Sequence, residues 1–287
     1  MSEAGVLPGG AEIRSLSRPE EYAACVALQR DTWGTEYDGI VPASLLMVNQ
    51  KVGGVVAGAF DAHGRLLGTV FSLAGFREGR PAHWSHMLAV AADARGHGLG
   101  VRLKLFQRRE VLRQGVDTIF WTYDPLVARN AHMNLNRLGA EVDRFVPNLY
   151  GESDSPLHRG PTDRFIVRWR LESERAKAAM EGRLCGPHPE IRAAPLICGR
   201  LDAEGAPEVS SSDAWRNAGV VRVEIPGELE RLLERDPGEA RAWREATGRA
   251  FSRALARGYS VAGFYRDLEA ARSFYWLARG DDRSSAA

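Results

Sequence analysis

The chain has 287 residues, of which 44% are hydrophobic and 26% are charged, and its net charge is +1. This length is enough for one large or two modest domains with real cores. The balanced charge provides no basic field for nucleic acid or an anionic membrane, and no apolar run approaches the roughly 18 residues of a membrane span. Three scattered cysteines fit neither a disulfide framework nor a metal site.

The beginning of the chain, MSEAGVLPGGAEIRSL, lacks the basic and apolar regions of a secretory signal. We therefore expect a soluble, cytoplasmic protein. Lys51, Lys104 and Lys177 are the lysines of a chain whose other basic residues are arginines. Together with the abundant Ala and Gly, this usage is typical of a GC-rich bacterial genome.

The first 75 residues predict a strand, two helices and a hairpin. The strand is AEIRSL (11–16), and the first helix, PEEYAACVALQRDTW (19–33), begins with Pro19 in a favourable start position. A shorter helix is expected over 43–49. The segment 53–75, GGVVAGAFDAHGRLLGTVFSLAG, predicts two β-rich runs joined by a turn at AHG.

The next hundred residues alternate strands and helices. HWSHMLAV (83–90) is a strand, followed by a glycine-rich loop and a helix over 101–114 that Gly115 closes. VDTIFWTYDP and LVARNAHMNLNRLGA predict a strand and a helix, and AEVDRFVPNLYG and TDRFIVRWRL predict two strands joined by the polar loop GESDSPLHRGP. The order over 11–171 is β-α-α-β-β-β-α-β-α-β-β, which is mixed α/β with a parallel crossover only in the middle.

The rest of the chain is expected to form a linker and a smaller domain. Residues 172–218 contain one helical run, ESERAKAAMEGR, and otherwise read as loop. Residues 219–279 predict β-α-α-β-β, a domain of unknown role with the same order as 11–73, so a degenerate internal repeat is expected. Three tryptophans are expected to build the core of this domain: Trp215, Trp243 and Trp276.

The segment VAADARGHGLGVRL (90–103) carries the strongest signal. Its three glycines, Gly96, Gly98 and Gly100, lead directly into a helix. A simple tight turn needs one or two glycines, whereas three at alternate positions expose consecutive amides at the positive end of a helix, which suits phosphate. A dinucleotide-binding loop needs the third glycine one position later, and a P-loop needs Lys-Ser/Thr where Val101 and Arg102 stand.

The loop Arg95-Gly96-His97-Gly98-Leu99-Gly100 resembles the R/Q-x-x-G-x-G/A motif of the GNAT N-acetyltransferase superfamily. LAVAADA resembles that family's strand end, with Ala92 in place of the usual Pro, and NLNRLGA resembles its LYEKLGF motif. More narrowly, WTYDPLVARNAHMNLNRLGA, NLYG, TDRFIVRW and the late WRE…GYSVAGF resemble a group of uncharacterised predicted bacterial acetyltransferases. The resemblance covers about the first 170 residues, and it implies the GNAT fold over 11–171 and acetyl-coenzyme A as cofactor.

The resemblance also implies which residues hold the cofactor. Its pyrophosphate is expected on the loop amides, and its pantetheine arm on the backbone at the preceding strand end. The residues concerned are Leu88, Ala89, Val90, Arg95, Gly96, His97, Gly98, Leu99, Gly100 and Val101. The family's Asn at the start of the following helix aligns with Ala128. Asn130 either replaces it as a cofactor contact or has the structural role of capping the helix and packing against its neighbours.

The catalytic groups are less well defined. Many family members keep a Tyr as general acid where this chain has Leu135, so Tyr150, Tyr123 or water must serve instead; Tyr150 is preferred because NLYG ends a predicted strand. His86, on the cofactor strand, and Asp124, at the end of the next strand, are candidate bases. The alternatives are a histidine satisfied within the sheet and an aspartate that caps a turn. No metal site is expected, since the spacing of His83 and His86 points them to opposite faces.

The loop WGTEYDGIVP is expected to line the acceptor pocket through Trp33, Glu36 and Tyr37, although loop packing explains these residues equally well. The expected partner is a small-molecule or peptide amine, not nucleic acid or a membrane, and a homodimer is left open. The function implied is an N-acetyltransferase that works by direct attack in a ternary complex. The alternative is a non-catalytic sensor of coenzyme A, which the missing Tyr at Leu135 and the added C-terminal domain favour.

Overall fold

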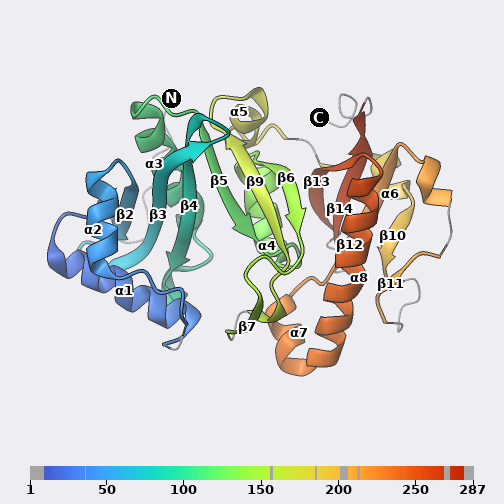
Figure 1. Cartoon of the computed structure of the whole chain (residues 1–287), viewed down its shortest axis with the longest axis horizontal. Helices are drawn as coiled ribbons and strands as arrows, with labels where there is room; N and C mark the ends of the chain where they lie inside the picture. Colours follow the sequence, from blue (N-terminus) through green and yellow to red (C-terminus); the bar gives the residue numbers. More distant parts are fainter. Residues whose placement is uncertain are drawn as a thin grey trace. The chain divides into compact units, whose positions relative to one another are not determined.

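The computed structural model describes residues 10–35, 37–155, 158–184, 186–200, 206–211, 214–267 and 272–280. The described chain is mixed α/β with mixed sheets, as expected (Figure 1). It separates into two compact units. Unit 1 contains residues 1–121, 155–157 and 170–172, and unit 2 contains residues 122–154, 158–169 and 173–287.

Unit 1 follows the predicted order of elements. These are β1 (Glu12–Ser15), α1 (Pro19–Trp33), α2 (Ala43–Lys51), β2 (Val55–Phe60), β3 (Leu66–Arg77), β4 (Arg80–Val90), the 3-10 turn η1 (Ala92–Ala94), α3 (Leu99–Arg113) and β5 (Thr118–Tyr123), whose last two residues belong to unit 2. The strands are ordered β1-β2-β3-β4-β5. Neighbours are antiparallel except β4 and β5, which are parallel, so the predicted crossover through α3 is confirmed.

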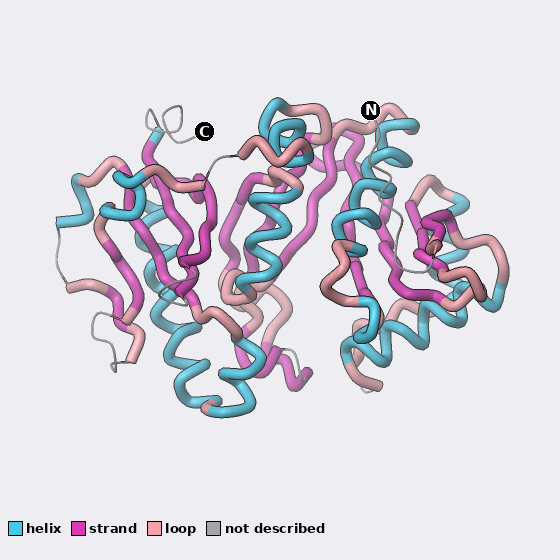
Figure 2. The backbone as a smooth tube through the Cα atoms, turned by 180° about the vertical axis from the view of Figure 1, so that it is seen from behind, coloured by secondary structure: helices cyan, strands magenta, loops and turns pink. Residues whose placement is uncertain are grey.

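The sheet of unit 1 is covered by α1 and α2 on one face and by α3 on the other (Figures 1 and 2). The helices bury apolar side chains against the sheet, and these side chains form the core of the unit. One continuous cluster consists of Leu16, Tyr22, Cys25, Val41, Leu46, Val56, Phe60, Phe71 and Met87.

Unit 2 contains the rest of the chain. Its elements are α4 (Ala128–Ala131), the π-helical stretch η2 (His132–Arg137), β6 (Glu141–Val146), β7 (Glu152–Ser155), β8 (His158–Pro161), β9 (Arg164–Arg170), α5 (Glu174–Met180), α6 (Pro189–Ala193), β10 (Leu196–Gly199), β11 (Glu208–Val209), η3 (Ala214–Asn217), β12 (Val220–Ile225), α7 (Leu229–Arg235), α8 (Pro237–Ala256), β13 (Tyr259–Asp267) and β14 (Arg272–Arg279). Here β5 continues into the order β5-β9-β6, and a five-stranded sheet has the order β11-β10-β12-β14-β13.

Two segments differ from the sequence-based expectation. The polar segment 151–161 was expected to be a loop but contains the two-stranded sheet of β7 and β8. Residues 172–218 were expected to be a linker, yet they contribute α5, α6, β10 and β11, and β10 pairs in parallel with β12. The run Leu196–Gly199 is too short to show a period, which is why the strand was missed.

The predicted order of elements in 219–279 is confirmed, but the strands of this segment pair differently from those of 11–73. The first half of the chain pairs β1 with β2, the near strand of the following hairpin, whereas β12 pairs with β14, the far strand. Either edge of a hairpin can accept a neighbour, so the order of elements does not fix the pairing. The order β10-β12-β14-β13 instead matches β4-β5-β9-β6, in which a parallel pair is followed by two antiparallel strands.

An aromatic cluster forms the centre of unit 2. The rings of Phe165 and Phe251 lie 4.8 Å apart, and that of Tyr275 lies 5.4 Å from Phe251, each pair in the edge-to-face arrangement that rings prefer. Phe165 is in β9, whereas Phe251 and Tyr275 are in α8 and β14. The cluster therefore joins residues from both sides of the predicted domain boundary at 171 within one compact unit. Trp215, Trp243 and Trp276 are buried, as expected.

A buried ion pair lies beside this cluster. Arg244 of α8 donates to both carboxylate oxygens of Asp124, at 3.2 and 2.7 Å, and Arg164 lies 3.8 Å from the same carboxylate. The three side chains are buried. Because burial removes water from the charges, the carboxylate depends on these guanidinium groups.

We expect Arg244→Ala to lower the free energy of unfolding by about 3 kcal/mol or more, because it leaves a buried carboxylate without its bidentate partner. Arg241→Ala is the matched control: Arg241 pairs with Glu245 at an exposed position of the same helix, and its loss should cost less than about 1 kcal/mol. Urea denaturation measures both values. Equal losses in the two variants would contradict a stabilising role for the buried pair.

Candidate site at the glycine loop of unit 1

Strand β4 changes its pairing halfway along. Its ladder with β5 consists, in the described chain, of the pairs His83–Ile119 and Trp84–Phe120. Its ladder with β3 shifts register directly afterwards, where Phe71 pairs with Met87 but Ser72 pairs with Ser85, so that His86 is the extra residue of a β-bulge. The second half of β4 therefore pairs with β3 on one edge and has no β5 partner on the other. The predicted cofactor residues Leu88, Ala89 and Val90 lie on this half.

The glycine loop links the end of β4 to α3. Gly96 has φ +86° and Gly98 has φ +72°, conformations that suit glycine, and a Cβ at either position would meet no atom within 4 Å. The first helical bond of α3 is donated by Arg102 to the carbonyl of Gly98. Among the described backbone hydrogen bonds outside helices and strands, none is donated by the amides of 96–101. The loop thus presents several amides at the positive end of a fifteen-residue helix.

The basic residues of the loop are at the surface. Arg95 is exposed, and its Nε donates to the carbonyl of Val90 at 3.1 Å, which ties the loop to the end of β4. His97 is also exposed. The carboxylate of Asp93 in η1 pairs with Arg65, in the turn before β3, at 2.8 Å. An anion at the loop amides would meet little opposing charge from this pair.

The two histidines of β4 have different surroundings. His83 is buried, with Nδ1 3.0 Å from the Ser72 hydroxyl and Nε2 3.2 Å from Gln114 Oε1, so it is satisfied within the sheet. His86, at the bulge, is exposed and meets the ring of Phe71 edge-on. Desolvation by its surroundings lowers the pKa of His86, which keeps the imidazole neutral at neutral pH.

Lys104 of α3 was not singled out from the sequence and is the most unusual residue of this unit. Its Nζ donates to Ser85 Oγ at 3.0 Å and to Gln107 Oε1 at 2.8 Å, and it lies 3.8 Å from the centre of the Trp121 ring. Ser85 and Trp121 are the residues that directly follow the last ladder pair on β4 and β5. Lys104 therefore occupies the point where the two strands stop pairing. Full burial lowers the pKa of its ammonium well below the usual range.

The residues expected to contact the acceptor lie at the end of α1 and in the loop that follows it. Trp33 and Tyr37 have ring centres 6.2 Å apart and are packed, half-buried, against the core cluster of unit 1. This packing accounts for both rings without an acceptor. Glu36 lies outside the described residues.

Unit 2 contains the other predicted catalytic residues. Tyr150 does not end a strand, as was expected, because β6 stops at Val146 and Tyr150 lies in the turn that follows. Its side chain is 56% exposed, and its hydroxyl is 3.1 Å from Thr122 Oγ1 at the end of β5. Tyr123 is in the aromatic cluster, where burial raises the pKa of its phenol, so it is a core residue rather than an acid.

Asp124 is accounted for by structure. Besides the ion pair with Arg244, its carboxylate accepts from the amide of Leu126 at 2.9 Å, the turn-capping role that was the alternative to catalysis. Asn130 is half-buried in α4, and its backbone amide donates to Val127. Leu135 is fully buried in η2. Its side chain has no hydroxyl that could act as the acid in place of the missing Tyr.

Two further observations concern metals and membranes. Among the described residues, no group of three or more His, Cys, Asp or Glu side chains is arranged to hold a metal ion. In the same part of the chain, no helix combines the length and the apolar character that crossing a bilayer requires.

Comparison with known proteins gave matches among solved structures, whereas no family model and no curated protein matches. The chain resembles GNAT N-acetyltransferases. One is a putative acetyltransferase of the GNAT family from Desulfovibrio desulfuricans, 15% identical, with 56% of this chain and 99% of that chain covered and a TM-score of 0.44. Another is a putative acetyltransferase from Salmonella typhimurium with its cofactor acetyl-CoA. It is 18% identical, with 57% of this chain and 95% of that chain covered and a TM-score of 0.47.

A third similar structure is the ribosomal-protein-S18-alanine N-acetyltransferase from Escherichia coli, 18% identical, with 57% of this chain and 95% of that chain covered and a TM-score of 0.45. In each case the neighbour is covered almost completely, while more than two fifths of this chain has no counterpart in it. At these identities the likeness concerns the fold alone.

We expect Lys104→Met to gain stability relative to the wild type at pH 7.5 and to lose that advantage toward pH 9.5. Between the lowered pKa of folded Lys104 and about pH 10.4, the unfolded chain binds a proton on Lys104 that the folded chain does not, so in this range the wild-type free energy of unfolding rises with pH by up to about 1.4 kcal/mol per unit. Urea denaturation across this range measures the slopes.

Lys51→Met is the control for this experiment, because Lys51 is exposed at the end of α2 and its loss should leave the wild-type slope unchanged. The same slope in the wild type and in Lys104→Met would show that Lys104 is charged in the folded protein.

Proposed function

We propose that the chain is a GNAT-type N-acyltransferase that takes its acyl group from acetyl-coenzyme A and passes it to an amine. The observation that carries this proposal is the loop RGHGLG, whose unpaired amides stand at the start of α3 directly after the half of β4 that lacks a β5 partner. This arrangement agrees with the resemblance of the loop to the GNAT motif.

The loop fits a pyrophosphate. Gly96 and Gly98 leave open space where side chains would otherwise stand, and the amides of a helix N-terminus favour an anion. Arg95 adds an exposed guanidinium beside them, and Leu88 to Val90 offer backbone for the pantetheine arm. The expected cofactor residues are thus Leu88, Ala89, Val90, Arg95, Gly96, His97, Gly98, Leu99, Gly100 and Val101. Asn130 stays a prediction without a contact to support it.

The chemistry requires two reactants to be positioned and protons to be moved. Acetyl-coenzyme A supplies an acyl group already activated as a thioester. The chain contributes amides of β4 that can polarise a carbonyl, and a neutral base that can accept the proton of the incoming ammonium. We assign the base to His86, since it is exposed at the bulge and its lowered pKa keeps it neutral. Asp124 is left out because its carboxylate is committed to Arg244.

The general acid is assigned to Tyr150, with water as the alternative. The hydroxyl of Tyr150 is exposed and has one described partner, Thr122, whereas Tyr123 is enclosed among aromatic rings. The acceptor is proposed to be a small-molecule or peptide amine that contacts Trp33 and Tyr37. A cytoplasmic location is part of this proposal, and whether the chain forms a homodimer stays open.

A second function is favoured by one observation. Leu135 is buried where many GNAT enzymes carry their acid, so the chain could bind coenzyme A without turning it over and act as a sensor. Thioester hydrolysis or transfer assayed with a mixed pool of amines separates the two functions. Binding without turnover would support the sensor.

We expect Gly98→Asp to abolish coenzyme A binding while the fold is retained. The new carboxylate would stand in the open space of the loop and repel the pyrophosphate. Isothermal titration calorimetry with coenzyme A measures the change.

Gly64→Asp is the matched control, since Gly64 also has a positive φ of +81° and open space around it, in the turn between β2 and β3. It should bind coenzyme A as the wild type does. Unchanged affinity in Gly98→Asp would remove the loop from the binding site.

We expect Tyr150→Phe to lower kcat tenfold or more with little change in coenzyme A affinity, because a general acid typically contributes 10²–10⁴-fold and only the hydroxyl is lost. Thr122→Val removes the hydrogen-bond partner of Tyr150 but keeps its hydroxyl, so its kcat should fall less. Steady-state kinetics on the acceptor found in the amine screen provides the comparison. A Tyr150→Phe enzyme within twofold of wild type would leave water as the acid.

A further inference from the structure

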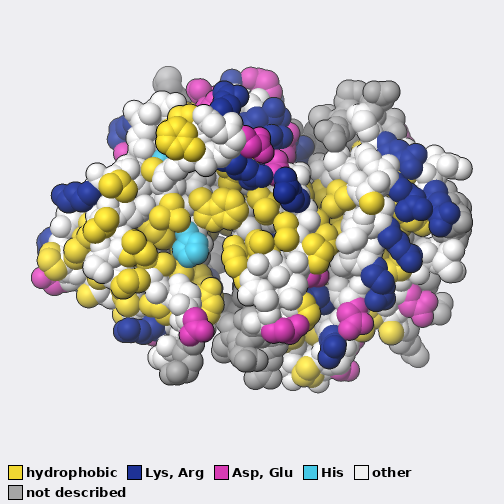
Figure 3. Space-filling view, viewed as in Figure 1, with side chains coloured by type: hydrophobic (Ala, Val, Ile, Leu, Met, Phe, Trp, Pro, Cys, Tyr) yellow, Lys and Arg dark blue, Asp and Glu magenta, His cyan; other side chains and the backbone are white. Residues whose placement is uncertain are grey.

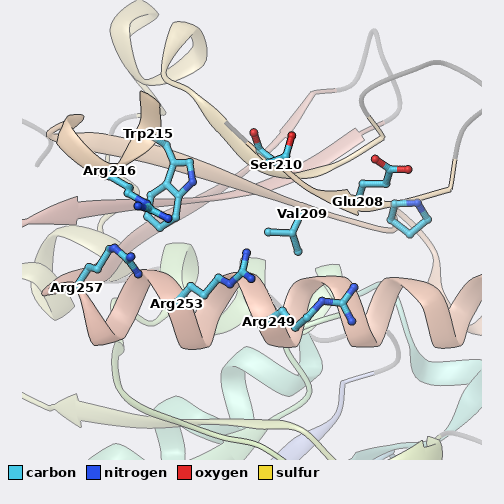
Figure 4. A pocket seen from close by; sticks show the side chains of 10 residues that line it. Glu208, Val209, Ser210, Trp215, Arg216, Arg249, Arg253 and Arg257 are labelled. Carbon is cyan, nitrogen blue, oxygen red and sulfur yellow. The ribbon is translucent and has the colours of Figure 1, made fainter. Parts of the chain in front are cut away.

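A cavity of about 730 Å³ lies within unit 2, between the second half of α8 and the segment that contains β11 (Figure 4). Its size is in the range of small-molecule sites. The proposed acyltransferase function assigns no role to it. Its basic and hydroxyl side chains are Ser210, Ser211, Arg216, Arg249, Arg253 and Arg257.

Three of the arginines form a row on one helix. Arg249 and Arg253 of α8 and Arg257, which caps its end, follow one another at intervals of four residues, and in Figure 4 their side chains project toward Val209 of β11. At 1.5 Å per residue the row extends over about 12 Å. Like charges at this interval repel and destabilise a helix by a few tenths of a kcal/mol per pair, so the row is not explained by helix formation.

Within the described part of the chain, the row differs from the arginines in the first half of α8 in forming no ion pair with an acidic residue. In the first half of the helix, Arg241 pairs with Glu245 and Arg244 with Asp124. By contrast, Arg249 and Arg253 have no carboxylate within 4 Å among the described side chains. Arg257 lies over the ring of Trp215, 5.4 Å from its centre. The negative end of the helix dipole favours cations in the last turn, but Arg249 lies two turns earlier.

The opposite wall adds hydroxyl groups and little negative charge. Ser210 and Ser211 follow β11, and Glu208 is the acidic residue of the lining. Four arginines against one glutamate leave the lining positive, and arginine side chains gather on the face over α8, β10 and β11 (Figure 3). Guanidinium groups bind phosphate through two parallel hydrogen bonds.

We propose that this cavity binds a small polyanion with two or more linked phosphate groups, of the kind found in a nucleoside triphosphate or in inorganic polyphosphate. A single phosphate is too small to contact arginines spread over about 12 Å, whereas a phosphate chain matches their spacing. The site is separate from the glycine loop, whose residues belong to unit 1. It is therefore independent of the proposed acyltransferase function.

The test is calorimetric titration of the full chain with tripolyphosphate and with ATP. We expect both to bind, and Arg253→Ala to weaken each at least tenfold. Arg249→Gln is a second variant with the same expected effect. Arg241→Ala removes an equal charge from the same helix outside the cavity and should stay within twofold of the wild type. Tighter binding of ATP would indicate a nucleotide, and equal binding would indicate the phosphate chain alone.

Several outcomes would overturn the proposal. These are the absence of binding by both probes, an affinity unchanged in Arg253→Ala and Arg249→Gln, and citrate binding as tightly as tripolyphosphate. Loss of binding in Gly98→Asp but not in Arg253→Ala would place the phosphate at the glycine loop instead. Arg249 and Arg253 are exposed, so their variants are expected to fold, and circular dichroism verifies this.

Discussion

The short parallel ladder between β4 and β5 is the constraint on which the proposed site depends. Two residue pairs form it, and the bulge at His86 and the amine of Lys104 both lie where a third pair would begin. Burying a lysine costs free energy, which its bonds to Ser85 and Gln107 and its contact with Trp121 offset in part. The second half of β4, which has no β5 partner in the described ladder, contains the proposed cofactor residues Leu88, Ala89 and Val90.

The position of the glycine loop depends in turn on how α3 packs. Leu99 and Leu103 are buried on the sheet, and a Cβ on Gly68 of β3 would come within 3.1 Å of Leu103 and 3.4 Å of Leu99. Glycine at this position lets the helix approach the strand closely. The first turn of α3 is thereby fixed against the end of β4, and the free amides of the loop are held by a packed core rather than by the loop itself.

Helices and strands, which depend on neighbouring residues, were largely predicted from the sequence. Side-chain roles that depend on distant residues were missed. The helix Pro19–Trp33 was placed to the residue, because periodicity and end signals are local. The ion pair of Asp124 and the burial of Tyr123 among aromatic rings were not predicted, since their partners Arg244 and Tyr275 are more than a hundred positions away. Lys104 could have been noticed, as it shares the spacing of the buried positions Gln107 and Val111.

The most direct test of the central claim is a crystal structure of the full chain with coenzyme A. The account predicts a pyrophosphate within hydrogen-bond distance of the amides of residues 96–101, and a pantetheine arm that pairs with the backbone of Leu88 to Val90. A pyrophosphate bound elsewhere, such as among the arginines of α8, with the glycine loop empty, would contradict it.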